Sequence, residues 1–111
     1  MFGLFRKRKA PNQARNDAQR AELAARGDDG SGARRVVHRA TPSPAGDINA
    51  TVVQDFLVIK GFDLSEIDDG GFSFAEERAV AGTDFDSHTD ELEKALAGWR
   101  WRYEGWSCPK A

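Results

Sequence analysis

The stretch FDLSEIDDGGFSFAEERAVAG, residues 62–82, contains the pattern that decides the fold. Each half of this stretch alternates apolar with polar residues, and the turn-forming sequence DDGG stands between the two halves. Such alternation on both sides of a glycine-containing turn is typical of a β-hairpin. We therefore predict two antiparallel strands over 62–67 and 71–82, joined by a turn at 68–71.

A helical pattern precedes this hairpin at DINATVVQDFLVIKG, residues 47–61. Asp47 is suited to cap the amino end of a helix, and Gly61 is suited to end it in a left-handed conformation. The apolar residues between them recur at helical spacing and form one broad face. The members of this predicted face are Ile48, Val52, Val53, Phe56, Leu57 and Ile59.

The remaining elements complete a β-α-β-β-α-β order. Ser87 with Asp90 three residues later matches a capping box and predicts the start of a second helix. Strand-like sequence occupies 34–41 and 101–107. Two right-handed crossovers around a hairpin place four antiparallel strands on one side and two helices on the other, which is the ferredoxin-like plan. We therefore predict a ferredoxin-like α+β domain over 34–111.

The amino-terminal part differs in charge and composition from this domain. Residues 1–39 hold ten Lys or Arg against four Asp or Glu, whereas residues 40–111 hold six against fourteen. The segment 15–27 contains good helix formers, but its apolar face is mostly alanine and would bury little. The segment 28–33, DDGSGA, has the composition of a flexible linker. We predict a basic tail over 1–33, disordered or partly helical, whose deletion leaves thermal stability nearly unchanged.

The composition argues against several kinds of site. A single cysteine, Cys108, allows no intramolecular disulfide and is interpreted as an inert residue rather than a nucleophile. With His38 and His88 as the only histidines, we predict no zinc cluster and no metal site. The start of the chain places apolar residues before cations, unlike a secretory signal, and no stretch approaches the roughly 18 apolar residues of a membrane span. We therefore expect a cytoplasmic protein without a cofactor or a small-molecule substrate.

Aromatic residues gather near the end of the chain, in RWRYEGWSCPKA at 100–111. Alternation places Trp99, Trp101 and Tyr103 on one face with the intervening arginines in solvent. A one-sided aromatic face in a small domain favours core packing over the stacking of nucleic-acid bases. Trp106 falls outside this alternation. It is either an exposed anchor for a protein partner or a core residue that caps the sheet.

The sequence YEGW, formed by Tyr103, Glu104, Gly105 and Trp106, carries a family resemblance. Together with GFDLSEI after the first predicted helix and ELEKALA in the second, it resembles the RraB family of small bacterial regulators of ribonuclease E activity. The signature of that family near its carboxyl end is Tyr-Asp-Gly-Trp. This chain matches at three positions and has Glu104 where the family usually has Asp.

The resemblance implies a non-catalytic protein that binds ribonuclease E and inhibits or modulates its RNA-degrading activity. It implies that Tyr103, Glu104, Gly105 and Trp106 bind the partner, and we expect the Tyr103 ring to be partly buried and the Trp106 ring to be presented. The residues themselves agree in two respects. No Ser-His-Asp order or glycine-rich phosphate loop points to an enzyme. The acidic balance of residues 40–111 suits a cationic partner.

A second function class stays open, a small nucleic-acid-binding module. The cations of FRKRK at 5–9 and the arginines near the carboxyl end suit contacts with phosphates. With Phe2 and Leu4, the same cations also suit a weak contact with an anionic membrane surface. A disordered tail without a dedicated ligand is the third interpretation. RNA affinity that falls steeply with salt would favour the nucleic-acid module, and almost no RNA affinity would favour the ribonuclease regulator.

Overall fold

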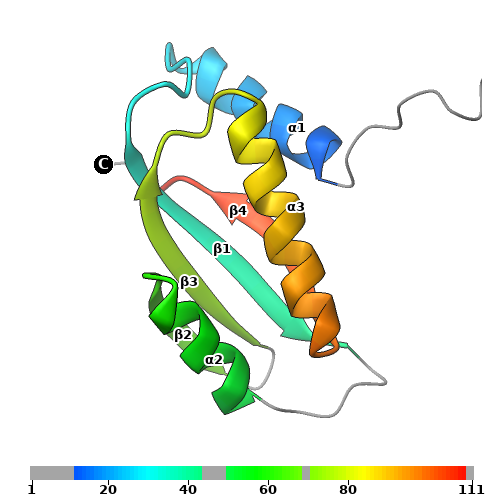
Figure 1. Cartoon of the computed structure of the whole chain (residues 1–111). Helices are drawn as coiled ribbons and strands as arrows, with labels where there is room; N and C mark the ends of the chain where they lie inside the picture. The colour runs from blue at the N-terminus through cyan, green and yellow to red at the C-terminus, as the bar shows by residue number, and fades with distance from the viewer. Residues whose placement is uncertain (1–11, 44–49, 69–70, 110–111) are drawn as a thin grey trace, which may run out of the picture.

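The computed structural model describes residues 12–43, 50–68 and 71–109 and shows an α+β architecture (Figure 1). Within these ranges a four-stranded antiparallel sheet is accompanied by three helices, and the strand order is β2-β3-β1-β4. The elements in chain order are α1 (Gln13–Ala25), β1 (Arg34–Pro42), α2 (Ala50–Ile59), β2 (Asp63–Asp68), β3 (Gly71–Arg78), α3 (Thr83–Gly98) and β4 (Trp101–Ser107). The predicted α+β class with four antiparallel strands is confirmed.

Strand β1 lies in the interior of the sheet, and its sequence sets one buried face. Val36, His38 and Ala40 are all buried, whereas the residues between them are partly exposed. In the antiparallel register with β3, His38 lies opposite Phe74 and Ala40 lies opposite Phe72. Because side chains alternate along a strand, these residues line the same face of the sheet. A histidine therefore occupies the middle of an otherwise apolar surface.

Strands β2 and β3 form the predicted hairpin, with residues 69–70 lying outside the described part of the chain. The pairing runs from Asp63 opposite Ala75 to Asp68 opposite Gly71. Gly71 has a φ of 134°, and a Cβ at this position would overlap the carbonyl oxygen of Ala40. Only glycine combines that backbone angle with so close an approach of a neighbouring strand. The β-hairpin prediction is confirmed.

Helix α2 is shorter than the predicted stretch 47–61, whose proposed N-cap Asp47 lies outside the described residues. The predicted stop is confirmed, because Gly61 has a φ of 100°. Val53 and Leu57 are buried in the core, but the predicted apolar face is wider than the observed one. Its other described members are partly buried or exposed: Val52, Phe56 and Ile59.

Helix α3 begins five residues earlier than the predicted capping box, with Ser87 as its N-cap, would place it. The helix starts at Thr83, directly after Gly82, whose φ is 89°. Ser87 and Asp90 therefore lie inside the helix, and the capping-box prediction is wrong. The carboxylate of Asp90 instead accepts hydrogen bonds of 3.2 Å from the backbone and side-chain nitrogens of Asn12. Asp90 thus connects α3 to the amino end of α1.

Helix α1 packs against the rest of the domain, beside the amino-terminal part of α3 (Figure 1). Its Leu23 belongs to the apolar core, and its Asn16 is fully buried. Arg20 donates hydrogen bonds to the carbonyl oxygen of Val80 at 2.9 Å and to Asp86 at 2.8 Å. This corrects the predicted flexible tail over 1–33 for residues 12–33, because polar contacts hold the alanine-rich helix in place.

One continuous core joins side chains from the helices and from β1, β3 and β4. Two ring pairs show how strand β4 completes this core. The ring centroids of Phe72 and Trp101 lie 5.0 Å apart, and those of Phe85 and Trp106 also lie 5.0 Å apart. Trp99 is partly buried, and its ring centroid lies 5.0 Å from that of Phe56. The expectation that aromatic residues near the end of the chain complete the core is confirmed.

Candidate functional site

Strand β4 contains a β-bulge at the predicted partner-binding residues. His38 on β1 pairs with Trp106, whereas Ala40, two residues later, pairs with Tyr103. Two residues along β1 thus correspond to three residues along β4, so β4 carries one extra residue between Tyr103 and Trp106. Gly105, with a φ of 103°, lies in this part of β4. The extra residue shifts the side-chain alternation by one position. Tyr103 and Trp106 are therefore both buried although they are three residues apart.

The indole of Trp106 is a core group, with only 5% of the residue exposed. Its Nε1 donates a 2.7 Å hydrogen bond to Oδ1 of Asn16 in α1. Its ring meets Phe85 of α3 edge to face. This corrects the expectation that the ring is presented to a partner, because the bulge turns Trp106 inward and α1 covers it.

The other three motif residues lie in different environments. Tyr103 is buried, and its carbonyl oxygen accepts a 3.2 Å hydrogen bond from Arg15. Gly105 is also buried, and a Cβ there would lie 2.7 Å from Cδ of Arg15. Glu104 is exposed and accepts a 2.6 Å hydrogen bond from the hydroxyl of Thr41. Of the four residues predicted to bind a partner, Glu104 alone offers an exposed side chain.

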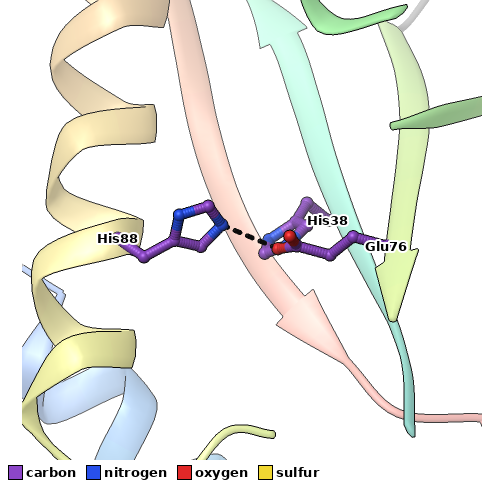
Figure 2. Close-up of side chains that lie close together, drawn as sticks. All are labelled: His38, Glu76 and His88. Carbon is purple, nitrogen blue, oxygen red and sulfur yellow. Dashed lines mark hydrogen bonds and ion pairs between the residues drawn. The ribbon is translucent and has the colours of Figure 1, made fainter. Parts of the chain in front are cut away.

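A second group of polar side chains lies inside the domain, where three elements meet. His38 of β1, Glu76 of β3 and His88 of α3 converge, as Figure 2 shows. The Nε2 atom of His38 lies 2.7 Å from Oε2 of Glu76, and the Nε2 atom of His88 lies 2.8 Å from the same oxygen. Both imidazoles thus lie within hydrogen-bond distance of the same carboxylate oxygen.

The protonation of this cluster follows from its contacts. An ionised carboxylate only accepts hydrogen bonds, so both Nε2–H groups donate to Glu76 and the Tyr103 hydroxyl donates to Nδ1 of His38 at 2.8 Å. Burial lowers the pKa of His38 and raises the pKa of Tyr103. Burial alone would raise the pKa of Glu76, but the hydrogen bonds from His38 and His88 lower it to about 2. A neutral His38 therefore stands beside an ionised Glu76.

Aromatic rings fix the two imidazoles in place. The His38 ring stacks on Phe74 at 5.1 Å between centroids and meets Phe62 edge to face at 5.8 Å. The His88 ring stacks on Phe62 with 6.2 Å between the ring centroids. Because His38 is fully buried and packed between two aromatic rings, its imidazole is held with Nε2 pointing toward Glu76.

A cavity of about 330 Å³ opens beside the cluster, bordered by α2 and α3. The side chains of Glu76 and His88 are 15% and 24% exposed and form part of its wall. Apolar and charged groups are mixed around it, so it suits a small polar ligand or an ion. Its lining residues are Phe56, Lys60, Phe62, Glu76, His88, Glu91, Leu92 and Ala95.

The sequence analysis missed the His38–Glu76–His88 cluster. Counting His and Cys argued against a zinc cluster, but the third polar group is a carboxylate on another strand. The signal available in the sequence was a polar residue at a core-facing position: His38 falls between the apolar Val36 and Ala40. Because the three residues come from separate elements, no local spacing could have connected them.

Comparison of the chain with models of protein families, with curated proteins and with solved structures found no match. The helices within the described ranges are too short or too polar to cross a membrane. The assignment of function therefore depends on the residues and their geometry.

Proposed function

We propose that this protein is a non-catalytic regulator that binds ribonuclease E and modulates its RNA-degrading activity, as the resemblance to the RraB family implies. The ferredoxin-like plan is part of the same proposal. It is supported by the β-α-β-β-α-β order of the elements that follow α1 and by the strand order β2-β3-β1-β4.

The observation that carries the proposal is the position of Glu104. Its carboxylate borders a shallow hollow of about 300 Å³ on the sheet, together with Arg39 and Ser107. The hydrogen bond from Thr41 holds one carboxylate oxygen, Oε2, in place. A positioned carboxylate in an open hollow suits an Arg or Lys side chain from a cationic protein surface.

Glu104 lies on the exposed face of β4. The side chains of Arg102, Glu104 and Ser107 are exposed, whereas Trp101, Tyr103 and Trp106 point into the core. The bulge at Gly105 places Ser107 on the exposed side after Trp106 has turned inward. In this proposal Tyr103, Gly105 and Trp106 act by shaping the strand that carries Glu104, and Glu104 makes the contact with the partner.

The second candidate function, nucleic-acid binding, has one supporting observation. Arg35 and Arg102 are exposed on the sheet and suit contacts with phosphates. Base stacking is not supported, because every aromatic side chain in the described part of the chain is buried or partly buried. The cations at 5–9 lie outside the described residues. This candidate therefore depends on phosphate contacts alone.

Two titrations of the full chain test the proposal. The first uses purified ribonuclease E and follows both binding and cleavage of an RNA substrate, and the proposal predicts saturable binding with altered cleavage. The second uses single-stranded RNA at about 50 mM and about 200 mM salt. RNA binding that weakens steeply with salt, without binding to ribonuclease E, would favour the nucleic-acid candidate and contradict the proposal.

A further inference from the structure

We infer that His38, Glu76 and His88 form a binding site for a divalent transition-metal ion such as Zn²⁺. The side chains offer two imidazole nitrogens and one carboxylate oxygen, and these atoms all lie within 4.8 Å of one another. Such a ligand set is common for zinc and for other first-row metals in proteins. This site lies in the interior of the domain and is separate from the exposed Glu104.

The present geometry is close to that of a bound ion. The two imidazole nitrogens stand 2.7 Å and 2.8 Å from Oε2 of Glu76. Around a tetrahedral zinc with bonds of about 2.0–2.2 Å, neighbouring ligand atoms lie roughly 3.3 Å apart. The carboxylate therefore has to withdraw by about half an ångström, and the two imidazole nitrogens, which lie within 4.8 Å of each other, have to settle at the same roughly 3.3 Å spacing around the ion. Glu76 borders the cavity, so its side chain has space for such a movement.

Tyr103 gives His38 the support that metal-binding histidines usually have. The phenol oxygen lies 2.8 Å from Nδ1, the ring nitrogen that would face away from the ion. When an ion takes the lone pair of Nε2, the ring proton moves to Nδ1 and the Tyr103 oxygen accepts it in a hydrogen bond. With Phe62 and Phe74 clamping the ring, His38 is oriented before the ion arrives.

The cavity supplies a route and an open coordination position. Glu76 and His88 are the members of the cluster that line its wall, whereas His38 is fully buried in the core behind them. Three protein ligands beside an open space leave a fourth position for water or for a group of a partner molecule. The carboxylate of Glu91 also lines the cavity and adds negative charge near the entrance.

The test is a calorimetric titration of the full chain with ZnCl₂ after treatment with EDTA and dialysis. We expect one ion per chain with a Kd in the micromolar range or tighter, about −8 kcal/mol. His88→Gln should weaken binding at least about tenfold, because it removes a ligand at a partly exposed position. Cys108→Ser is the control, since it removes the thiol while leaving the three ligands and the cavity intact.

A second readout separates loss of the ligand from loss of the fold. Circular dichroism checks that each variant is folded, and Co²⁺ absorption reports the coordination sphere directly. Visible Co²⁺ bands in the wild type that disappear in a folded His88→Gln or Glu76→Gln variant would support the site. Absence of stoichiometric Zn²⁺ binding to the wild type would overturn the inference. Binding that survives His88→Gln and Glu76→Gln but is lost in Cys108→Ser would also overturn it.

Discussion

The indole Nε1 of Trp106 donates a 2.7 Å hydrogen bond to Oδ1 of Asn16, a residue 90 positions earlier in the chain. The amide nitrogen of Asn16 in turn donates to Oδ1 of Asp86 and to the hydroxyl of Thr89, both at 2.9 Å. One buried amide thus connects α1, α3 and β4. The tryptophan of the YEGW motif is therefore part of the attachment of α1 to the domain.

Replacement of this amide should be costly. We expect Asn16→Ala to lower the free energy of unfolding by about 2–3 kcal/mol, because it leaves the buried Trp106 Nε1 unpaired. Urea denaturation measures the loss. Glu22→Ala, at an exposed position of the same helix, is the control and should change stability by less than about 0.5 kcal/mol. Equal effects of the two substitutions would show that the Asn16 contacts contribute little.

Deletion of residues 1–33 should lower the thermal midpoint, in contrast to the prediction from the sequence. The deletion removes Leu23 from the core, a loss of about 2–5 kcal/mol for a buried leucine cut back to alanine. For a domain of this size such a loss lowers the midpoint by roughly 10 °C or more. Leu23→Ala in the full chain should reproduce part of the decrease. An unchanged midpoint after deletion would mean that α1 does not stabilise the domain in solution.

The sequence predicted the strands and the two later helices because their apolar residues recur with a clear period. Phe72 and Phe74 alternate in β3, and Val53 and Leu57 recur at helical spacing in α2. The docking of α1 has no such signal, since the buried side chain that holds Trp106 is the polar Asn16. A hydrophobic pattern cannot reveal an interaction made by amides and carboxylates.

The position of each motif residue was harder to predict than the strand that carries them. Strict alternation would place Tyr103 and Trp106 on opposite faces, and the bulge at Gly105 places both in the core. Similarly, His38 and His88 meet only because Glu76 lies between them on a strand that is distant in the sequence. Both features depend on how strands and helices pair, which local spacing does not specify.

Two glycines allow a matched test of how much a side chain costs at a position with positive φ and a close neighbour. Gly105→Ala should destabilise the protein by about 1–3 kcal/mol, since its φ of 103° is strained for a residue with a side chain. The new methyl group would also meet Arg15 of α1. Gly98→Ala is the control, because nothing lies within 4 Å of the added atom. Denaturation curves of the two variants that coincide would contradict the tight approach of α1 to β4.

Stability should fall as the pH is lowered from about 7 to about 3. Burial depresses the pKa of His38 below its usual 6.5, so below that pH the unfolded chain binds a proton that the folded chain does not. A second loss of stability follows between about pH 4.5 and about pH 2. Burial disfavours the Glu76 carboxylate, but the hydrogen bonds from its two histidine donors lower its folded-state pKa to about 2. The unfolded state therefore binds more protons in both windows, and the free energy of unfolding decreases.

Urea unfolding in EDTA at a series of pH values measures this decrease without a contribution from metal ions. Glu76→Gln, whose amide cannot ionise, should lose the contribution of Glu76 to the pH dependence below about pH 4.5, while Asp28 and Asp29, whose pKa values are also lowered by hydrogen bonds, keep theirs. A wild-type stability that stays constant from pH 7 to pH 4 would contradict the assignment of a neutral, buried His38 beside an ionised Glu76.

The most direct measurement of the proposed function compares two charge reversals on the sheet. Glu104 lines the hollow on β4, whereas Glu77 of β3 is also exposed but lies outside it. Ribonuclease E is titrated with folded Glu104→Lys, Glu77→Lys and the wild-type chain. We predict that Glu104→Lys weakens binding at least about tenfold and that Glu77→Lys stays within about threefold of the wild type. Equal affinities of the two variants, or wild-type affinity for Glu104→Lys, would contradict the proposal that Glu104 is the contact with the partner.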